Sequence, residues 1–518
     1  MTTSVPAPKS RILSARRLVL LASVAGLGVA VLGGADLVTK ASGPALSTVA
    51  YAQGVQRPMG FADIVEKVKP AVISVRVKLD AGPKMMGMEG DSPAAPNSQM
   101  ERFFRRFGMP DMAPDEQRGQ RSPADPRSPR NRLVTGQGSG FFITADGYAV
   151  TNNHVVDKAD TVEVTTDEGK TYTAKVIGTD PRTDLALIKV EGRTDFPYAK
   201  LSEKAPRIGD WVLAVGNPFG LGGTVTAGIV SARGRDIGAG PYDDFIQIDA
   251  PVNKGNSGGP TFDVDGNVLG VNTAIFSPSG GSVGIAFAIP ATTVKSVVAQ
   301  LKDTGKVSRG WIGVQIQPVT AEIAENLGLK GPEGAMVSDP QDNGPAAKAG
   351  ILAGDVITKV NGAPVKDAKD LARQIGAMAP GATAKLSVWR KGEEKTLSIA
   401  LGELPNQREA KAGTPDSSGR SGTDVPRLGL TVAPAGQVAG SGSEGVVVTE
   451  VDPNGLASDQ GFKTGDVILD VGGKKVGNPG DVRDAIRDAQ KGGKNTVLMR
   501  VKSGGEGTKF VALRLGKA

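Results

Sequence analysis

Short apolar segments follow one another between residues 138 and 290, and this pattern limits the possible folds more than any other feature of the sequence. The segments recur roughly every ten residues, with Gly, Asp and Pro between them. Such a pattern favours an antiparallel barrel or sandwich over alternating strands and helices. The predicted strands are Tyr148–Thr151, Val162–Thr165, Thr173–Ile177, Leu185–Val190, Trp211–Val215, Val225–Val230, Phe245–Ile248 and Val268–Thr273, and the predicted closing helix is Ala291–Leu301.

The composition excludes several classes of chemistry. The chain has no cysteine, which rules out disulfides, thiol catalysis and Cys-ligated metals. Because His154 is the only histidine, a zinc site with several His ligands is excluded. No Gly-x-x-x-x-Gly-Lys-Ser/Thr loop is present, so we expect no ATP. We also expect no metal and no other cofactor, because the serine mechanism predicted below supplies its own nucleophile. The 61 basic and 54 acidic residues leave a net charge of +7 without a long basic run, which argues against a nucleic-acid partner.

The N-terminus is typical of an export segment. Basic residues at positions 9 to 17 precede an uncharged apolar run, Leu18–Leu32, which is short for a membrane-spanning helix. Ala50-Tyr51-Ala52 fits a cleavage site with small residues. We predict that residues 1–52 form a signal peptide, with a retained N-terminal anchor as the alternative. In both cases the bulk of the chain is expected to act outside the cytoplasm.

Residues 58–304 are predicted to form the first globular unit. A helix from Phe61 to Val68 and a strand from Ala71 to Val77 precede the strand series. The stretch at about 80–132 is rich in Met, Pro and Arg and has little periodicity. Because it cannot bury enough apolar surface to offset its ordering entropy, we predict a mobile insert.

The remainder of the chain contains an internal repeat. Gly354-Asp355-Val356-Ile357 recurs as Gly465-Asp466-Val467-Ile468, an offset of 465 − 354 = 111 residues. Each copy is predicted to combine glycine-flanked strands with short helices. We place the copies at 308–404 and 427–517, and a Gly/Ser/Thr/Asp-rich flexible linker at 405–426 between them.

A glycine-rich motif surrounds one serine, in Gly255-Asn256-Ser257-Gly258-Gly259-Pro260. A serine hydroxyl needs a base before it can act as a nucleophile. Glycines permit a tight turn that exposes the hydroxyl, and they allow backbone N–H groups to converge where an oxyanion would form. We expect Gly255 and Ser257 to supply these N–H groups and Asn256 to shape the turn. An ordinary glycine-rich turn is the alternative interpretation.

Two further residues complete a possible catalytic set. His154 follows a predicted strand in Thr151-Asn152-Asn153-His154, and Asp184 directly precedes an apolar strand. The order His, Asp, Ser has spacings of 184 − 154 = 30 and 257 − 184 = 73 residues. In such a triad the acid orients the imidazole, which deprotonates the serine and then protonates the leaving amine. The three residues in one β-rich unit therefore predict a serine protease.

These motifs identify a family resemblance that covers nearly all of the chain after the export segment. The region from Phe61 to Leu301 resembles the protease domain of the HtrA/DegP (Do-like) serine proteases, and the two repeats resemble the paired PDZ domains of that family. The matching protease segments are Thr151–Val156, Arg182–Leu187, Gly216–Gly220 and Gly255–Pro260. The resemblance implies a mostly β fold: a chymotrypsin-like double β-barrel followed by two α+β PDZ domains. It also implies that His154, Asp184 and Ser257 are the triad.

The resemblance further implies a setting for the protein. It suggests an exported, periplasmic enzyme that assembles as a homotrimer or a larger homo-oligomer. Anchoring to the inner membrane, facing the periplasm, is the alternative, as is peripheral membrane association. The insert at about 80–132 corresponds to a long loop that in this family can reach a neighbouring subunit, although its sequence here differs.

The substrate pocket is expected to be small and apolar. The residues just before Ser257 include no acid, so nothing there would attract a Lys or Arg side chain. Ile275, Phe276 and Ile285 resemble the family's pocket-lining strand. We therefore expect cleavage after Val, Ala or similar residues. The alternative is that these three are ordinary core residues.

The repeats are expected to bind peptides. A PDZ domain adds an extended peptide as a strand and holds its terminal carboxylate with backbone N–H groups. The loop that holds the carboxylate is predicted at Trp311-Ile312-Gly313-Val314 in the first repeat and at Arg427-Leu428-Gly429-Leu430 in the second. A structural β-turn is the alternative for the second copy.

The sequence thus predicts an ATP-independent serine endopeptidase that degrades unfolded or misfolded exported proteins. Its partners would be unfolded polypeptides and apolar C-terminal tails, captured by the PDZ domains. A holdase chaperone with latent or secondary protease activity is the alternative. A PDZ scaffold on an inactive protease domain is disfavoured, because all three triad residues are present.

Overall fold

The structure is a computed structural model that describes residues 60–79, 134–405, 423–425 and 428–515, apart from residues 158, 160, 221, 279, 439, 494, 505 and 506. The predicted export segment, the insert at about 80–132 and nearly all of the predicted linker lie outside the described residues. No helix among the described residues is both long and apolar enough to cross a bilayer.

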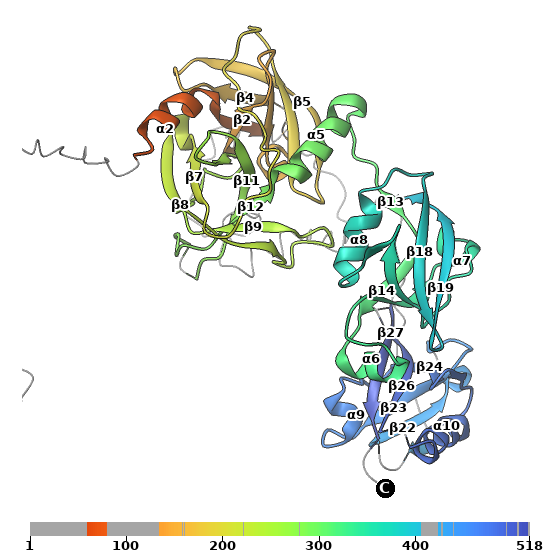
Figure 1. Cartoon of the computed structure of the whole chain (residues 1–518). Coiled ribbons are helices and arrows are strands. Elements are labelled where there is room, and N and C mark those ends of the chain that lie inside the picture. Colours follow the sequence, from red (N-terminus) through yellow and green to blue (C-terminus); the bar gives the residue numbers. More distant parts are fainter. Residues whose placement is uncertain are drawn as a thin grey trace, which may run out of the picture. The chain divides into compact units, whose positions relative to one another are not determined.

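The first six strands close into a barrel in the order β1-β2-β3-β6-β5-β4 (Figure 1). Every neighbouring pair in this barrel is antiparallel. Helix α2 and a 3-10 turn lead into the barrel, and the short helix α4 connects β3 to β4. The bounds are α2 Ala62–Val68, η1 Lys69–Ala71, β1 Val72–Leu79, β2 Val134–Phe142, β3 Tyr148–Thr151, α4 Asn153–Val156, β4 Thr161–Thr165, β5 Thr171–Asp180 and β6 Leu185–Val190.

Six further strands close a second barrel in the order β10-β11-β12-β9-β8-β7 (Figure 1). Helix α5 follows it and ends at Gly305, whose φ of 73° is left-handed. The two closed barrels confirm the predicted double β-barrel. The bounds are β7 Trp211–Gly216, η3 Pro218–Gly220, β8 Thr224–Arg235, β9 Phe245–Ile248, β10 Pro260–Phe262, β11 Val268–Ile275, β12 Ala286–Pro290 and α5 Ala291–Thr304.

One continuous hydrophobic core joins the two barrels. It contains Phe141, Val150 and Leu187 from the first barrel together with Phe262 and Val271 from the second. All five side chains are fully buried. A second cluster fills the rest of the first barrel. Because the shared core fixes one barrel against the other, residues at the ends of strands from both barrels can meet with defined geometry.

Each repeat forms a sheet with short helices, which confirms the two predicted PDZ domains. In the first repeat the strand order is β14-β15-β16-β18-β19, so β14 lies at the end of the sheet. The bounds are β13 Gly310–Trp311, β14 Val314–Pro318, α6 Ala321–Leu327, β15 Ala335–Pro340, α7 Pro345–Lys348, β16 Val356–Val360, β17 Ala363–Pro364, α8 Ala368–Gly376, β18 Thr383–Arg390, β19 Glu393–Ala400 and β20 Gly402–Glu403.

The second repeat has the same architecture with one additional strand, in the order β21-β22-β23-β24-β26-β27. Its helix α10 begins with a capping box at Asn478 and Asp481. The bounds are β21 Thr423–Val425, β22 Leu430–Pro434, η5 Ala435–Gln437, β23 Val446–Val451, α9 Leu456–Asp459, β24 Val467–Val471, β25 Lys474–Lys475, α10 Pro479–Lys491, β26 Thr496–Ser503 and β27 Gly507–Arg514.

The structure explains why a Gly-Asp pair occurs at the same place in both repeats. Gly354 and Gly465 have φ angles of 91° and 94°, which favour glycine. The aspartate after each glycine is buried and closes the turn, because its carboxylate accepts from the backbone N–H three residues earlier, Leu352 at 2.9 Å and Lys463 at 3.0 Å.

Candidate active site

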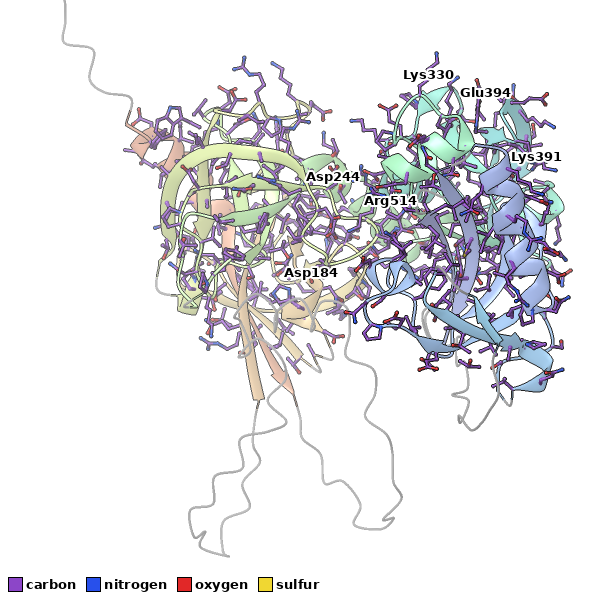
Figure 2. The ribbon with its side chains drawn as sticks, turned by 90° about the horizontal axis from the view of Figure 1, so that it is seen from below. Asp184, Asp244, Lys330, Lys391, Glu394 and Arg514 are labelled. Atoms are coloured by element: carbon purple, nitrogen blue, oxygen red, sulfur yellow. The ribbon has the colours of Figure 1, made fainter. Side chains whose placement is uncertain are left out.

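Asp184 and His154 lie in direct contact. The Asp184 Oδ2 atom is 2.7 Å from His154 Nδ1, and its Oδ1 atom accepts from the His154 backbone N–H at 3.0 Å. The Asp184 carbonyl accepts from Asn152 Nδ2 and from the Asn153 backbone N–H. These contacts fix both the imidazole ring and the backbone that carries it. Figure 2 labels Asp184 within the double barrel, where it is buried.

The local chain explains how these two residues meet. Asp184 ends the four-residue loop of the β5–β6 hairpin, in which Asp180 pairs with Leu185. Its φ of 56° lies in the left-handed region, which aspartate tolerates better than most residues. The sequence predicted His154 at the end of a strand. The structure differs slightly, because β3 ends at Thr151 and His154 lies in the following short helix α4.

The loop that carries Ser257 is hydrogen-bonded to a strand of each barrel. The Gly258 N–H donates to Asn272 in β11, and the Ser257 carbonyl accepts from the N–H of Ser139 in β2, both at 2.8 Å. A Cβ atom on Gly258 would lie 2.2 Å from the Ser139 carbonyl oxygen and 2.5 Å from Thr151 Oγ1. Only glycine fits this approach, so the serine loop packs against the end of the strand that leads to His154.

Gly138 lies between the serine loop and the histidine segment. A Cβ atom there would lie 2.6 Å from the Val155 side chain and 3.0 Å from the Ser257 carbonyl oxygen. The structure therefore brings His154, Asp184 and Ser257, which are up to 103 residues apart (257 − 154), into one region between the barrels.

The backbone N–H groups of the serine loop have different partners. The Asn256 N–H donates to the Asn253 carbonyl at 3.1 Å, which closes a turn. The N–H groups of Gly255 and Ser257 donate no hydrogen bond to any part of the chain that the structure describes. The N–H groups of Gly255 and Ser257, on either side of Asn256, are therefore available to donate to an oxyanion.

Ser139 forms hydrogen bonds with Gly255, Asn217 and Thr151. It was not among the site residues predicted from the sequence. Its buried hydroxyl donates to the Gly255 carbonyl at 2.6 Å and accepts from the Asn217 N–H at 2.8 Å. Its carbonyl accepts from Thr151 Oγ1 at 2.7 Å. The available signal was the run Gly138-Ser139-Gly140, because consecutive small residues in a strand mark a close approach of other backbone.

Thr273 was also missed. Its hydroxyl donates to Asp184 Oδ2 at 2.6 Å, so the carboxylate that contacts His154 has a second donor from the other barrel. Thr273 lies at the irregularity in pairing between β11 and β12, where the register shifts between Asn272 and Ala274. Such a bulge redirects a side chain, and no local sequence pattern marks it.

The three predicted pocket residues lie together at the ends of β11 and β12. The Phe276 N–H donates to the Ile285 carbonyl at 2.9 Å. Ile275 is buried in the shared core and Ile285 packs against that core, whereas the Phe276 side chain is exposed. Ile275 therefore has a packing role in the barrel, whether or not its neighbours contact a substrate.

The two predicted carboxylate loops have the same backbone pattern. In the first repeat the Ile312 and Gly313 carbonyls accept from Ala346 and Gln341, and the Gly313 φ is 72°. The N–H groups of Ile312 and Gly313 have no hydrogen-bond partner within the described ranges. Of the other two residues in this loop, Trp311 pairs with Gly402 and Val314 begins β14.

The second loop repeats this pattern. The Leu428 and Gly429 carbonyls accept from Ala457 and Asp452, and Leu430 begins β22. Arg427 lies outside the described residues.

The strand edges beside these two loops differ. In the second repeat β21 pairs antiparallel with β22, from Val425↔Leu430 to Thr423↔Val432, and helix α10 contacts both strands. In the first repeat the corresponding side of β14 is paired with no strand among the described residues. A PDZ ligand adds as a strand at this edge. The edge is therefore open to a ligand in the first repeat, whereas β21 of the chain itself covers it in the second.

Acidic residues at the end of the β8–β9 loop have perturbed pKa values. Burial raises the pKa of the Asp243 carboxyl, although that carboxylate accepts from the Ile237 and Ala239 N–H groups. Burial also raises the pKa of the neighbouring Asp244 carboxyl, against the opposing charges of Arg373 and Arg233. Figure 2 labels Asp244 in this loop region of the double barrel.

Three family models match this chain. A model described as a trypsin-like peptidase domain matches residues 138–271. Two models described as PDZ domains match residues 310–401 and 447–500. The domain boundaries at 58–304, 308–404 and 427–517 stay predictions.

Curated relatives match over nearly the whole chain. A protein of Brucella melitensis biotype 1 named "Probable periplasmic serine endoprotease DegP-like" is 51% identical over 500 residues, which cover 94% of this chain and 96% of the relative. A protein of the same name from Pseudomonas putida is 40% identical and covers 91% of this chain and 96% of its own length. A solved structure described as "HtrA-type protease AlgW with decapeptide" is 36% identical with a TM-score of 0.53, covering 67% of this chain and 100% of that chain.

Proposed function

The chain belongs to the HtrA/DegP family of serine endoproteases, and we propose that it cleaves unfolded or misfolded polypeptides with His154, Asp184 and Ser257 as its catalytic triad. The observation that carries this proposal is the 2.7 Å contact between His154 Nδ1 and Asp184 Oδ2, formed beside the loop of Ser257. A buried carboxylate at Nδ1 fixes the tautomer and stabilises the imidazolium that forms during the reaction.

The proposed reaction uses each residue in turn. The Ser257 hydroxyl attacks the carbonyl carbon of the substrate while His154 accepts its proton, and the proton then passes to the leaving amine. Water, deprotonated by the same histidine, then attacks the resulting ester, and the proton passes from His154 to the Ser257 oxygen as the acyl–oxygen bond breaks. The N–H groups of Gly255 and Ser257 stabilise the oxyanion in both steps, and Asn256 holds the turn that presents them. The reaction requires neither ATP nor a metal, because the serine is itself the nucleophile.

The expected specificity follows from the residues near the nucleophile. Phe276 and Ile285 provide apolar surface near the ends of β11 and β12, where Ile275 is buried in the core. Ala250, Pro251 and Val252 precede the serine loop without an acid. We expect cleavage after Val, Ala or similar residues. A peptide library in which the enzyme prefers Arg or Phe at the cleaved position would exclude this specificity.

The first PDZ domain is the proposed site of peptide capture. Its loop at Trp311–Val314 offers free N–H groups, and the neighbouring edge of β14 is open. An apolar C-terminal tail can add there as a strand with its carboxylate in the loop. The second loop, Arg427–Leu430, is a weaker candidate because β21 already covers the edge of β22.

We place the enzyme in the periplasm. The curated relatives carry that location in their names, and the N-terminal residues 1–52 have the composition of a signal peptide. Homo-oligomerisation, as a trimer or a larger assembly, is supported by exposed apolar side chains on the double barrel, such as Ile208 and Trp211.

The decisive experiment compares the mature chain with its Ser257→Ala variant. Both are incubated with a reduced, unfolded model protein at several temperatures, and degradation is followed beside an aggregation assay. We expect degradation by the wild type alone. Loss of degradation in His154→Ala and in Asp184→Asn, with unchanged melting temperatures, would support the assignment of all three residues.

The same experiment tests the chaperone alternative. If neither the wild type nor Ser257→Ala degrades the substrate and both suppress aggregation, the main function is that of a holdase. If Ser257→Ala degrades the substrate as fast as the wild type does, Ser257 is not the nucleophile.

A further inference from the structure

A buried ion pair joins the loop of the catalytic acid to the segment before the first PDZ domain. Arg309 donates to both carboxylate oxygens of Asp180, from Nη1 at 3.0 Å and from Nη2 at 2.5 Å. The two residues are only 7% and 3% exposed. Placing an ion pair in the interior is costly unless the geometry is good and the remaining hydrogen bonds are satisfied. This pair meets both conditions, because the contact is bidentate and Asp180 has further donors.

Asp180 also organises the loop that ends at Asp184. Its carboxylate accepts from Thr183 Oγ1 at 2.5 Å and from the Arg182 N–H at 3.4 Å. The loop from Asp180 to Asp184 spans only four steps and closes the β5–β6 hairpin. Asp184 occupies a left-handed conformation there, which its surroundings must hold in place. The Asp180 carboxylate therefore stabilises this loop, residues 180–184, which we call the acid loop.

Arg309 is itself held on two sides. Its guanidinium lies over the Tyr242 ring at 4.7 Å from the ring centroid, and its carbonyl accepts from the Leu404 N–H at 3.0 Å. Val307, two residues earlier, packs against the shared core of the barrels. Arg182, Thr183 and Tyr242 also line a cavity of about 20 Å³, which is room for about one water molecule. The acid loop, Arg309 and Tyr242 thus form one packed unit.

We propose that Arg309 is a positioning residue for the catalytic acid: through Asp180 it holds the loop that sets the orientation of Asp184 toward His154. The proposal rests on the proposed function only in calling Asp184 the catalytic acid. Arg309 lies two residues before the predicted carboxylate loop that begins at Trp311, so the same segment joins the peptide site to the acid loop.

The experiment uses four full-length variants: Arg309→Gln, Arg309→Lys, the double variant Asp180→Asn/Arg309→Gln, and Lys369→Gln as the matched control. Lys369, in helix α8 of the first PDZ domain, forms ion pairs with Asp236 and, at 3.9 Å, with Asp243 of the β8–β9 loop, and it has no hydrogen bond or ion pair with the described residues of the acid loop. The double variant leaves no buried charge without its partner, so it separates positioning from the penalty of an unpaired charge.

Activity is measured on a short internally quenched peptide chosen from the fragments that the wild type releases. We expect Arg309→Gln and the double variant to lower kcat by about 10- to 100-fold with little change in KM, since misplacement by a fraction of an ångström slows chemistry more than binding. The acidic limb of the pH–rate profile should move to lower pH in both, because a displaced Asp184 stabilises the imidazolium less. Arg309→Lys should recover part of kcat, and Lys369→Gln should match the wild type.

A second readout does not depend on catalysis. His154 is the only histidine, so its ring signals are unambiguous in an NMR spectrum of histidine-labelled protein. We expect these signals to shift in Arg309→Gln and in the double variant but not in Lys369→Gln, whether or not Ser257 proves to be the nucleophile. Wild-type kcat, pH profile and His154 signals in the double variant would overturn the proposal, as would equal effects of Lys369→Gln.

Discussion

The Thr273 hydroxyl donates to the Asp184 carboxylate from the second barrel. We predict that Thr273→Val, which keeps the shape of the side chain but removes the donor, lowers kcat by about tenfold, since a hydrogen bond to a buried charge is worth about that factor. Steady-state kinetics on a short peptide would measure the effect.

The matched control for this prediction is Thr273→Ser, which restores a hydroxyl at the same backbone position. It should recover most of kcat, whereas the melting temperatures of both variants should remain close to that of the wild type. Equal kcat values for the Val and Ser variants would show that the hydroxyl is not needed to orient Asp184.

At the scale of single residues, the sequence predicts the candidate catalytic side chains but not the residues that form hydrogen bonds with them. His154 could be identified because the chain has one histidine, and Ser257 because glycines surround it. The contact between Thr273 and Asp184 joins residues 89 positions apart, and a threonine in a strand has an ordinary packing explanation. Ser139 is hidden in the same way, because its hydrogen bonds exist only after β2, β3 and the serine loop have come together.

At the scale of elements, the β8–β9 loop should respond to pH through Asp244. Burial raises the pKa of this carboxyl, so the folded chain binds its proton more tightly than the unfolded chain does. The stability that this group contributes is present at low pH and is lost as the pH rises through the raised value. We therefore predict that Asp244→Asn is more stable than the wild type at about pH 8, by roughly 1–2 °C in Tm.

This advantage should shrink as the pH falls and the wild-type carboxyl becomes protonated. Thermal unfolding from about pH 8 down to about pH 4, close to the ordinary pKa of an aspartate, would measure it. The control is Asp303→Asn, a change of the same charge at an exposed position near the end of α5. If Asp303→Asn produces the same shift, the effect comes from net charge and not from the burial of Asp244.

The strand edges of the two PDZ domains predict one peptide site per chain. A peptide with an apolar C-terminal residue is titrated by calorimetry into the full-length Ser257→Ala protein, which is used to prevent cleavage. We expect a stoichiometry near one, lost when the peptide is amidated, because the Ile312 and Gly313 N–H groups are the proposed donors to the terminal carboxylate.

Two glycine variants assign the peptide site to one domain. Gly313 and Gly429 have φ angles of 72° and 69°, so alanine is strained at both positions. Gly313→Ala should abolish binding and Gly429→Ala should leave it intact, since β21 covers the second edge. Loss of binding in Gly429→Ala alone would assign the peptide site to the second domain.

The elements themselves were largely predictable from the sequence, with instructive exceptions. Strands with clear turn residues at both ends, such as Leu185–Val190 and Phe245–Ile248, have the predicted bounds. The predicted strands did not include β10, which has three residues directly after the serine loop. Periodicity needs several residues to show, and a strand of three residues is specified mainly by its neighbours. The covering strand β21 falls in a segment predicted as a linker.

At the scale of the whole molecule, several large apolar side chains of the double barrel remain exposed, and two of them, Ile208 and Trp211, are only three residues apart in the sequence. Ile208 and Trp211 are 66% and 49% exposed, and the Trp211 ring contacts Phe61, at a centroid distance of 5.5 Å, just before α2. The sequence could not show this, because Trp211 begins a predicted strand and only the closed barrel determines which of its side chains face outward. Exposed aromatic and aliphatic side chains that lie together are typical of subunit interfaces.

We predict that this patch of Phe61, Ile208 and Trp211 holds the homo-oligomer together. The double variant Ile208→Ser/Trp211→Ser should shift the protein from an oligomer to a monomer at micromolar concentration, as measured by light scattering after size-exclusion chromatography. Tyr198→Ser is the matched control, because Tyr198 is also 49% exposed on the same barrels but lies outside the patch. If the double variant stays oligomeric, other residues form the interface. If it becomes monomeric yet cleaves a short peptide at the wild-type rate, each double barrel carries a complete active site, and assembly serves the capture of long unfolded substrates.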